Sequence, residues 1–177
     1  MKHQRRRLCL LALPLLLSAC RTAAVPPGSR APEAPGPREE LQAAVAARLD
    51  AFHGAAARAD FEAYFEVLAE DAVFIGTDAS ERWSKAEFAA YTRPYFSRGQ
   101  GWTYVAVERH VMLSPEGRLA WFDERLENSK YGAARGSGVL RLEPDGRWRL
   151  AHYVLSFPIP NQLADDFTAR IRAAEPR

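Results

Sequence analysis

Two tight turns in the C-terminal half of the chain constrain its fold most. The segments Ser114–Gly117 and Pro144–Gly146 each separate two stretches rich in apolar residues, which is the pattern of β-hairpins. Closing the first turn between Ser114 and Gly117 brings the apolar residues of 103–113 opposite those of 118–127. A Gly146 in the left-handed conformation likewise brings the apolar residues of 136–142 opposite those of 148–154. The sequence therefore predicts antiparallel strands throughout residues 103–157.

These two registers place polar side chains on the face of the sheet predicted to point inward. In the first hairpin Arg109 and Glu124 form a diagonal pair within reach of each other. In the second hairpin His152 lies on the inward face beside Gly136 and Gly138. A glycine inside a strand marks either the close approach of a ligand or a sharp bend. The two glycines therefore predict either the floor of a cavity or a bend in a curved sheet.

Two helices are predicted at the start of the domain. Apolar residues recur at helical spacing from Glu39 to about Ala57. Asp60 can cap a shorter helix from Phe61 to about Leu68. His53 has no partner at helical spacing on the first of these helices. We therefore expect His53 to lie on the surface and to bind no ligand.

A third helix is predicted from Lys85 towards Phe96, after a short strand at 72–75. Ser84 and Glu87 have the spacing of a capping box, which satisfies backbone N–H groups at a helix start. The acidic turn before this helix is a candidate rim for a ligand pocket, although turn capping is the favoured explanation of its carboxylates. Candidate ligand-binding residues in and after this turn are Asp78, Glu81, Trp83 and Tyr91.

Residues 1–19 have the pattern of a secretory signal peptide. A basic start precedes an apolar run from Leu8 to Leu17 that is too short to span a membrane. The segment Leu17–Cys20 resembles a bacterial lipobox, and this resemblance implies cleavage before Cys20 and lipidation of its thiol. The alternative is an ordinary signal peptide that ends near a cysteine. The proline-rich residues 20–37 predict an extended tether, and residues 38–177 predict one domain.

An exported lipoprotein of this kind would be anchored to a membrane through Cys20 on the periplasmic face. By resemblance to bacterial lipoproteins, Arg21 in place of an aspartate after the cysteine implies the outer membrane, where the cell has one. Four of the 24 Lys and Arg residues and none of the 22 Asp and Glu residues lie in residues 1–19. The mature chain then carries a net charge of about −2, which offers no basic patch for a nucleic acid partner.

The cysteine and histidine pattern predicts neither a metal nor another cofactor. Cys9 lies in the signal peptide and Cys20 would carry the lipid, so the domain has no thiolate ligands and no disulfide. His152 with scattered carboxylates lacks the ligand spacing of a metal site.

The order helix, helix, short strand, helix and long antiparallel strands resembles the nuclear transport factor 2-like superfamily, and more narrowly its bacterial SnoaL-like domains. The resemblance covers about Glu39 to Phe167. It implies an α+β cone, in which a curved antiparallel sheet wraps around three N-terminal helices and leaves a deep pocket at the wide end. The segments that carry it are Phe74–Asp78, Glu81–Ser84, Ala120–Glu124, Arg135–Leu140 and Trp148–Asn161.

Two functions follow from the predicted pocket, because the superfamily contains isomerases, dehydratases, cyclases and hydrolases as well as proteins without known chemistry. In the first, His152 and Glu124 act as general acid and base, and Asp78, Trp83, Tyr91 and Arg109 orient a small organic ligand. In the second, the domain binds a ligand or a partner chain without turnover, and Arg109 and Glu124 form a satisfied buried pair.

A homodimer is a further expectation. The register of the second hairpin places an apolar strip on the outer face of the sheet, which a second copy of the chain could cover. The residues of the predicted strip are Val139, Tyr153, Leu155 and Phe157.

Overall fold

The computed structural model describes residues 36–174. The predicted signal peptide, the lipidated Cys20 and nearly all of the tether lie outside the described residues. Between residues 36 and 174, no helix combines the length and the apolar character that crossing a membrane requires.

Three helices precede most of the sheet, as predicted. They are α1 (Pro37–Ala57), α2 (Phe61–Glu66) and α3 (Lys85–Phe96). The Asp60 side chain accepts a hydrogen bond from the Ala63 N–H and caps α2. The capping box of Ser84 and Glu87 is present at the start of α3. The second helix ends two residues earlier than predicted, because Leu68 already begins a strand.

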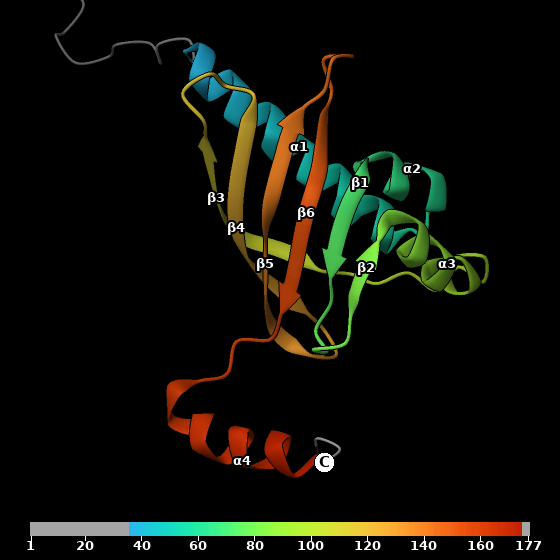
Figure 1. The fold of residues 1–177 in the computed structure, drawn as a ribbon, viewed down its shortest axis with the longest axis vertical. Helices are drawn as coiled ribbons and strands as arrows, with labels where there is room; N and C mark the ends of the chain where they lie inside the picture. Colours follow the sequence, from blue (N-terminus) through green and yellow to red (C-terminus); the bar gives the residue numbers. More distant parts are fainter. Residues whose placement is uncertain (1–35, 175–177) are drawn as a thin grey trace, which may run out of the picture. The chain divides into compact units, whose positions relative to one another are not determined.

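Six strands form one curved sheet in the order β2-β1-β6-β5-β4-β3. All neighbours are antiparallel except β1 and β6, which run parallel. Figure 1 shows α1 crossing behind one face of this sheet. The α+β fold class is confirmed, with a mixed sheet in place of a purely antiparallel one. The strand bounds are β1 Leu68–Ile75, β2 Arg82–Ser84, β3 Val105–Leu113, β4 Leu119–Asn128, β5 Gly132–Leu142 and β6 Trp148–Ser156.

The core lies between α1 and the concave face of the sheet. Val45 and Leu49 of α1 are fully buried, and they belong to the same cluster as Phe122, Leu140 and Leu150 of the strands. Burying aliphatic and aromatic side chains of this size stabilises the fold by about 1.5–3 kcal/mol each. After the sheet, the short turn η1 (Asn161–Leu163) leads to α4 (Ala164–Ala174), which has no buried residue.

The first hairpin has a longer loop than the sequence predicted. Ser114 bonds to Leu119 through its backbone N–H, and its hydroxyl accepts hydrogen bonds from the N–H groups of Arg118 and Leu119. Consequently Arg109 pairs directly with Glu124, where Phe122 was predicted. A shift of two residues keeps every side chain on its own face. The inward orientation of Arg109 and Glu124 is therefore confirmed, although the predicted register is wrong.

The second hairpin follows its predicted register only near the turn. Leu140 lies opposite Leu150 as predicted, but the next pair joins Val139 to His152, so Ala151 is an extra residue on β6. This β-bulge turns every later side chain of β6 to the opposite face. Tyr153 is buried in the core at 3% exposure, and His152 lies on the outer face. The inward placement of His152 is therefore wrong.

The bulge also explains one of the two strand glycines. A Cβ atom on Gly138 would lie 2.1 Å from the carbonyl oxygen of His152, so only glycine fits beside the bulged strand. The bend is therefore confirmed as the reason for Gly138. The same change of face corrects the predicted dimer strip. Val139 stays outside, Tyr153 moves into the core, and Leu155 and Phe157 line a pocket.

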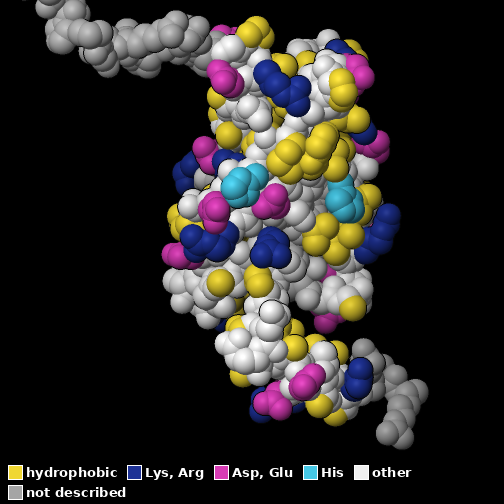
Figure 2. Space-filling model, turned by 90° about the vertical axis from the view of Figure 1, so that its left-hand side faces the viewer, with side chains coloured by type: hydrophobic (Ala, Val, Ile, Leu, Met, Phe, Trp, Pro, Cys, Tyr) yellow, Lys and Arg dark blue, Asp and Glu magenta, His cyan; other side chains and the backbone are white. Residues whose placement is uncertain are grey.

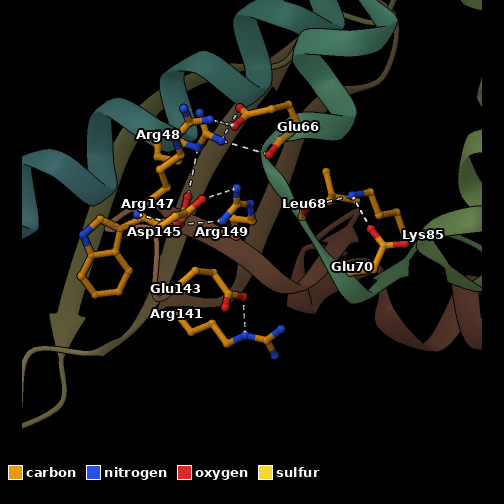
Figure 3. A network of polar contacts seen from close by, with 11 residues as sticks. Arg48, Glu66, Leu68, Glu70, Lys85, Arg141, Glu143, Asp145, Arg147 and Arg149 are labelled. Atoms are coloured by element: carbon orange, nitrogen blue, oxygen red, sulfur yellow. Dashed lines mark hydrogen bonds and ion pairs between the residues drawn. The ribbon is translucent and has the colours of Figure 1, made fainter.

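A network of charged side chains ties α1 and α2 to the turn between β5 and β6 (Figure 3). Arg48 bonds to the Glu66 carboxylate and to the backbone oxygen of Trp148. Arg147 also reaches Glu66, at 2.9 Å, and Arg149 reaches Asp145 at 2.7 Å. The two bonds of Arg48 link segments that lie 18 and 100 residues apart in the chain.

Acid is expected to remove the contribution of this network to stability. Hydrogen bonds from Arg149 lower the pKa of Asp145 from 3.8 to about 2. Because this folded-state pKa lies below the unfolded value, the contribution is complete above about pH 4 and is lost as the pH falls through about 2. Arg149→Gln should therefore lower the urea midpoint at about pH 7, and the difference from the unchanged chain should vanish near pH 2.

The exposed Arg170 on α4 provides the control, because the described contacts give it no acidic partner. Arg170→Gln should leave the urea midpoint unchanged at both pH values. A deficit of Arg149→Gln that is the same at neutral and acidic pH would show that the Asp145 pair does not act through its charge.

Candidate functional site

A cavity of about 450 Å³ opens at one end of the sheet. The loop between β1 and β2, the turn between β4 and β5 and the end of β6 come together there (Figure 1). Its size is within the range of pockets that bind small organic molecules. Aromatic side chains make up most of its lining, and they form two walls.

The first wall consists of nearly parallel rings from β1, β2 and α3. The Trp83 ring stacks on Phe88 with centroids 5.3 Å apart and on Tyr91 with centroids 4.8 Å apart. Phe74 stacks on Phe88 at 3.9 Å. Trp83 precedes the helix cap at Ser84, and Phe88 lies in the first turn of α3, which is the spacing of a hydrophobic staple. The start of α3 therefore positions this wall.

A second group of lining residues, the second wall, comes from later parts of the chain, and its Trp102 ring contacts Phe88 of the first wall with centroids 6.2 Å apart. Trp102 and Tyr104 lie in the connection between α3 and β3, and Tyr131 lies in the turn between β4 and β5. The Tyr131 ring contacts that of Phe157, with centroids 5.2 Å apart. Leu155 completes this wall.

Tyrosine hydroxyls supply part of the polar surface of the pocket. Burial raises the pKa of the Tyr91 hydroxyl, and the neighbouring Tyr95 and Glu81 raise it further. Burial also raises the pKa of Tyr104, with a smaller contribution from Tyr131. Both hydroxyls therefore stay protonated at neutral pH and can donate hydrogen bonds to a ligand.

Glu81 is the acidic residue of the pocket lining. Its Oε2 accepts a hydrogen bond from the backbone N–H of Asp78 at 3.1 Å. A Cβ atom on Gly76 would lie 2.1 Å from the same oxygen, so the glycine leaves room for the carboxylate against the pocket wall. Two of the rim candidates, Trp83 and Tyr91, also line the cavity.

Asp78 caps the turn instead of facing the pocket. Its carboxylate accepts hydrogen bonds from the hydroxyl and the N–H of Ser80, and these bonds lower the pKa of Asp78. The turn-capping explanation is therefore the one that the structure supports for this residue.

Glu124 is the centre of a separate charged group in the core. It is 1% exposed. Its Oε1 lies 2.6 Å from Nε2 of His53, and its Oε2 accepts a hydrogen bond from Nε of Arg109 at 2.8 Å. Arg109 also donates to the carboxylate of Asp50 at 2.7 Å and to the backbone oxygen of Ala46 at 3.0 Å. The buried pair of Arg109 and Glu124 is therefore confirmed.

The prediction that His53 is a surface residue without a partner is wrong. Its side chain is 11% exposed and pairs with Glu124. A partner was sought only along the helix, whereas the true partner lies on a strand 71 residues later. One signal was present, because His53 follows Val45 and Leu49 at a spacing of four and so continues the buried stripe of α1.

Gly136 makes room for side chains and not for a ligand. A Cβ atom there would lie 2.7 Å from both Oε1 of Glu124 and the hydroxyl of Tyr153. The predicted cavity floor beside Gly136 and Gly138 is therefore filled. None of the described residues that line the aromatic pocket belongs to the Glu124 group. Leu155, which lines the pocket, is the strand partner of Gly136 on β6.

Among residues 36–174, no group of three or more histidine, cysteine or acidic side chains is arranged to hold a metal ion. The aromatic pocket therefore has hydrogen-bond donors and one carboxylate as its polar groups.

An α+β cone with helices on the concave face of a curved sheet and a pocket at one end defines the nuclear transport factor 2-like fold. The sequence model of the SnoaL-like domain matches residues 45–160, and the chain belongs to this family. None of the curated proteins matches the chain.

Solved structures share the fold at low sequence identity. A candidate dehydratase of the NTF2-like family from Streptomyces avermitilis is 17% identical, with a TM-score of 0.57 over 67% of this chain and 96% of that chain. An NTF2-like protein of unknown function from Pseudomonas putida is 15% identical, with a TM-score of 0.58 over 70% of this chain and 90% of that chain. A ketosteroid isomerase-like protein from Erwinia carotovora atroseptica is 21% identical, with a TM-score of 0.51 over 68% of this chain and 98% of that chain.

Proposed function

We propose that this SnoaL-like domain binds a small organic ligand in the aromatic pocket. The observation that supports this function best is a cavity of about 450 Å³ whose two walls are built from aromatic rings. Stacking on these rings would supply affinity, and the protonated hydroxyls of Tyr91 and Tyr104 would orient polar groups of the ligand.

The chemistry of the pocket is left undecided in this proposal, because the predicted acid or base does not line it, although Glu81 and tyrosine hydroxyls do. His152, the predicted acid or base, lies on the outer face of the sheet. Among the described residues that line the pocket, none is a histidine. The His53 and Glu124 pair lies in the core and bonds to Arg109. An isomerase or dehydratase of this fold remains the alternative, and its test is whether any ligand found is converted to product.

Trp83→Leu should weaken ligand binding at least tenfold, because the indole stacks on two other rings of the first wall and such contacts contribute about 0.5–1.5 kcal/mol each. The measurement is quenching of tryptophan fluorescence during titration with a panel of small cyclic ketones, phenols and amines. Trp121→Leu is the matched control, since Trp121 lies on a strand and is 45% exposed outside the pocket.

Trp121→Leu should leave ligand affinity unchanged. Equal affinity of both tryptophan variants and the unchanged chain would contradict binding in this pocket. Quenching by no member of the panel would count against the proposed function itself.

We also propose that the chain is exported and anchored to a membrane by lipid on Cys20, on the periplasmic side. The support is the sequence of residues 1–20, with its basic start, apolar run and lipobox-like end. Mass spectrometry of the mature N-terminus tests this proposal, since an unmodified N-terminus elsewhere in the chain would contradict it.

A homodimer through the outer face of the sheet is proposed on a corrected set of residues. The paired positions Trp121 and Val139, and Val139 and His152, form a row across β4, β5 and β6. Figure 2, which faces the β3 side of the domain, shows hydrophobic side chains exposed next to histidines. Sedimentation velocity of the unchanged chain and of Trp121→Arg tests the proposal, because only the substituted chain should be monomeric.

A further inference from the structure

The charge of the pocket restricts the chemistry of its ligand. The described lining contains the carboxylate of Glu81 and no lysine, arginine or histidine. An anionic ligand would therefore approach a carboxylate and the negative faces of aromatic rings without a compensating positive charge among the described lining residues. A phosphate or carboxylate group is disfavoured as the recognised part of the ligand.

The Glu81 carboxylate is held in place but is not neutralised. It accepts one backbone hydrogen bond, from Asp78, and lies against Gly76. Among the described residues, no basic side chain forms an ion pair with it. A neutral ligand that covers this pocket would remove water from the carboxylate and leave it without a counter-charge, which is costly. A cationic ligand would supply that counter-charge.

The aromatic walls provide the second half of a cation site. The π faces of tryptophan and tyrosine attract ammonium groups by about 0.5–1 kcal/mol at exposed sites and about 2 kcal/mol when water is excluded. The Tyr131 ring already contacts an ammonium group of the chain, since Nζ of Lys130 lies 4.7 Å from its centroid, so the other rings of the lining are the ones expected to contact a cationic ligand. Tyr91 and Glu81 both line this pocket.

We propose that the pocket recognises an alkylated ammonium group, with Glu81 as its counter-ion and the aromatic side chains of the lining, among them Trp83 and Tyr91, as its contact surface. This inference rests on the proposed function and names the ligand class of the same pocket. The methyl groups of such a cation would contact the rings, and its charge would face the carboxylate.

The test compares choline with its uncharged carbon isostere, 3,3-dimethylbutanol, which has the same shape without the charge. Both are titrated into the full chain, and binding is followed by tryptophan fluorescence and calorimetry. We expect choline to bind at least about tenfold more tightly than the isostere, and we expect this preference to weaken as ionic strength rises.

Glu81→Gln keeps an oxygen that can accept the Asp78 hydrogen bond and removes only the charge. It should reduce the preference for choline to less than about threefold, because choline loses its counter-ion and the isostere no longer has to remove water from a charged group. Glu40→Gln, an exposed glutamate in the first turn of α1, is the control and should retain the full preference.

Equal binding of choline and the isostere to the unchanged chain would overturn the inference and leave the proposed function standing. Binding of a neutral aromatic compound with no binding of choline would likewise overturn the inference and leave the proposed function standing. Failure of both probes and of the whole ligand panel would overturn the inference together with the proposed function. The comparison of the two probes needs no substituted chain, so it holds even where Glu81→Gln folds poorly.

Discussion

Glu124→Gln is expected to lower the free energy of unfolding by about 3 kcal/mol. The Glu124 carboxylate is fully buried and bonds to both His53 and Arg109. A glutamine amide of the same size has one acceptor oxygen in place of two and carries no negative charge. The Arg109 guanidinium would therefore lose its buried counter-ion. Removing one partner of a buried ion pair typically costs about 3–5 kcal/mol. We expect the lower end, because Asp50 still pairs with Arg109.

Urea unfolding followed by circular dichroism measures this change. Glu127→Gln, three residues later on the same strand and exposed, is the matched control and should change the free energy of unfolding by less than about 0.5 kcal/mol. The double variant Arg109→Met with Glu124→Leu should be less destabilised than either single change, because neither of these two buried charges is then left without the other, although Asp50 and His53 each lose one partner. A double variant as unstable as the sum of both would contradict this account.

Gly138→Ala is expected to lower the free energy of unfolding by about 3 kcal/mol or more, which is at least as much as Glu124→Gln. The added methyl group would lie 2.1 Å from the backbone oxygen of His152 and 3.0 Å from the Phe122 ring. The ring can move, but the carbonyl belongs to the bulged backbone of β6 and cannot move without breaking strand pairing. Relief of this clash requires β5 and β6 to separate.

Thermal unfolding and the yield of soluble protein measure the effect. Ser137→Ala is the control on the same strand, because the Ser137 side chain points to the outer face. It should unfold within about 2 °C of the unchanged chain. A Gly138→Ala variant with the same stability as this control would show that β6 has no bulge at Ala151.

The elements could be predicted from the sequence because local chemistry determines them. The capping box of Ser84 and Glu87 sets the start of α3, and Asp60 sets the start of α2. The turns at Ser114 and Gly146 set two hairpins. These signals depend on residues within four positions of one another, so they can be recognised in the sequence without knowledge of the fold.

The candidate site was harder to predict because it depends on pairing between distant strands. The partner of His53 lies 71 residues away, and no local pattern indicates it. The aromatic pocket joins the start of α3 to Tyr131 and Phe157, which meet only when β4, β5 and β6 are in register. Trp83 and Tyr91 were found because helix capping already placed them on one side of α3.

The extra residue at Ala151 reverses which side chains of β6 point into the core. Upstream of it, even-numbered side chains point into the core, and downstream of it odd-numbered ones do. Loss of Ala151 alone would restore regular alternation and leave the later side chains where they are, because Leu150 would still pair with Leu140 and His152 with Val139. A related chain that kept this residue but paired without the bulge would instead set His152 opposite Gly138, turning the histidine into the cone and Tyr153 and Leu155 out of it. The bulge therefore keeps the His152 imidazole on the outer face, and relatives that lack the bulge at the same strand length are where acid/base chemistry in the same fold is to be sought.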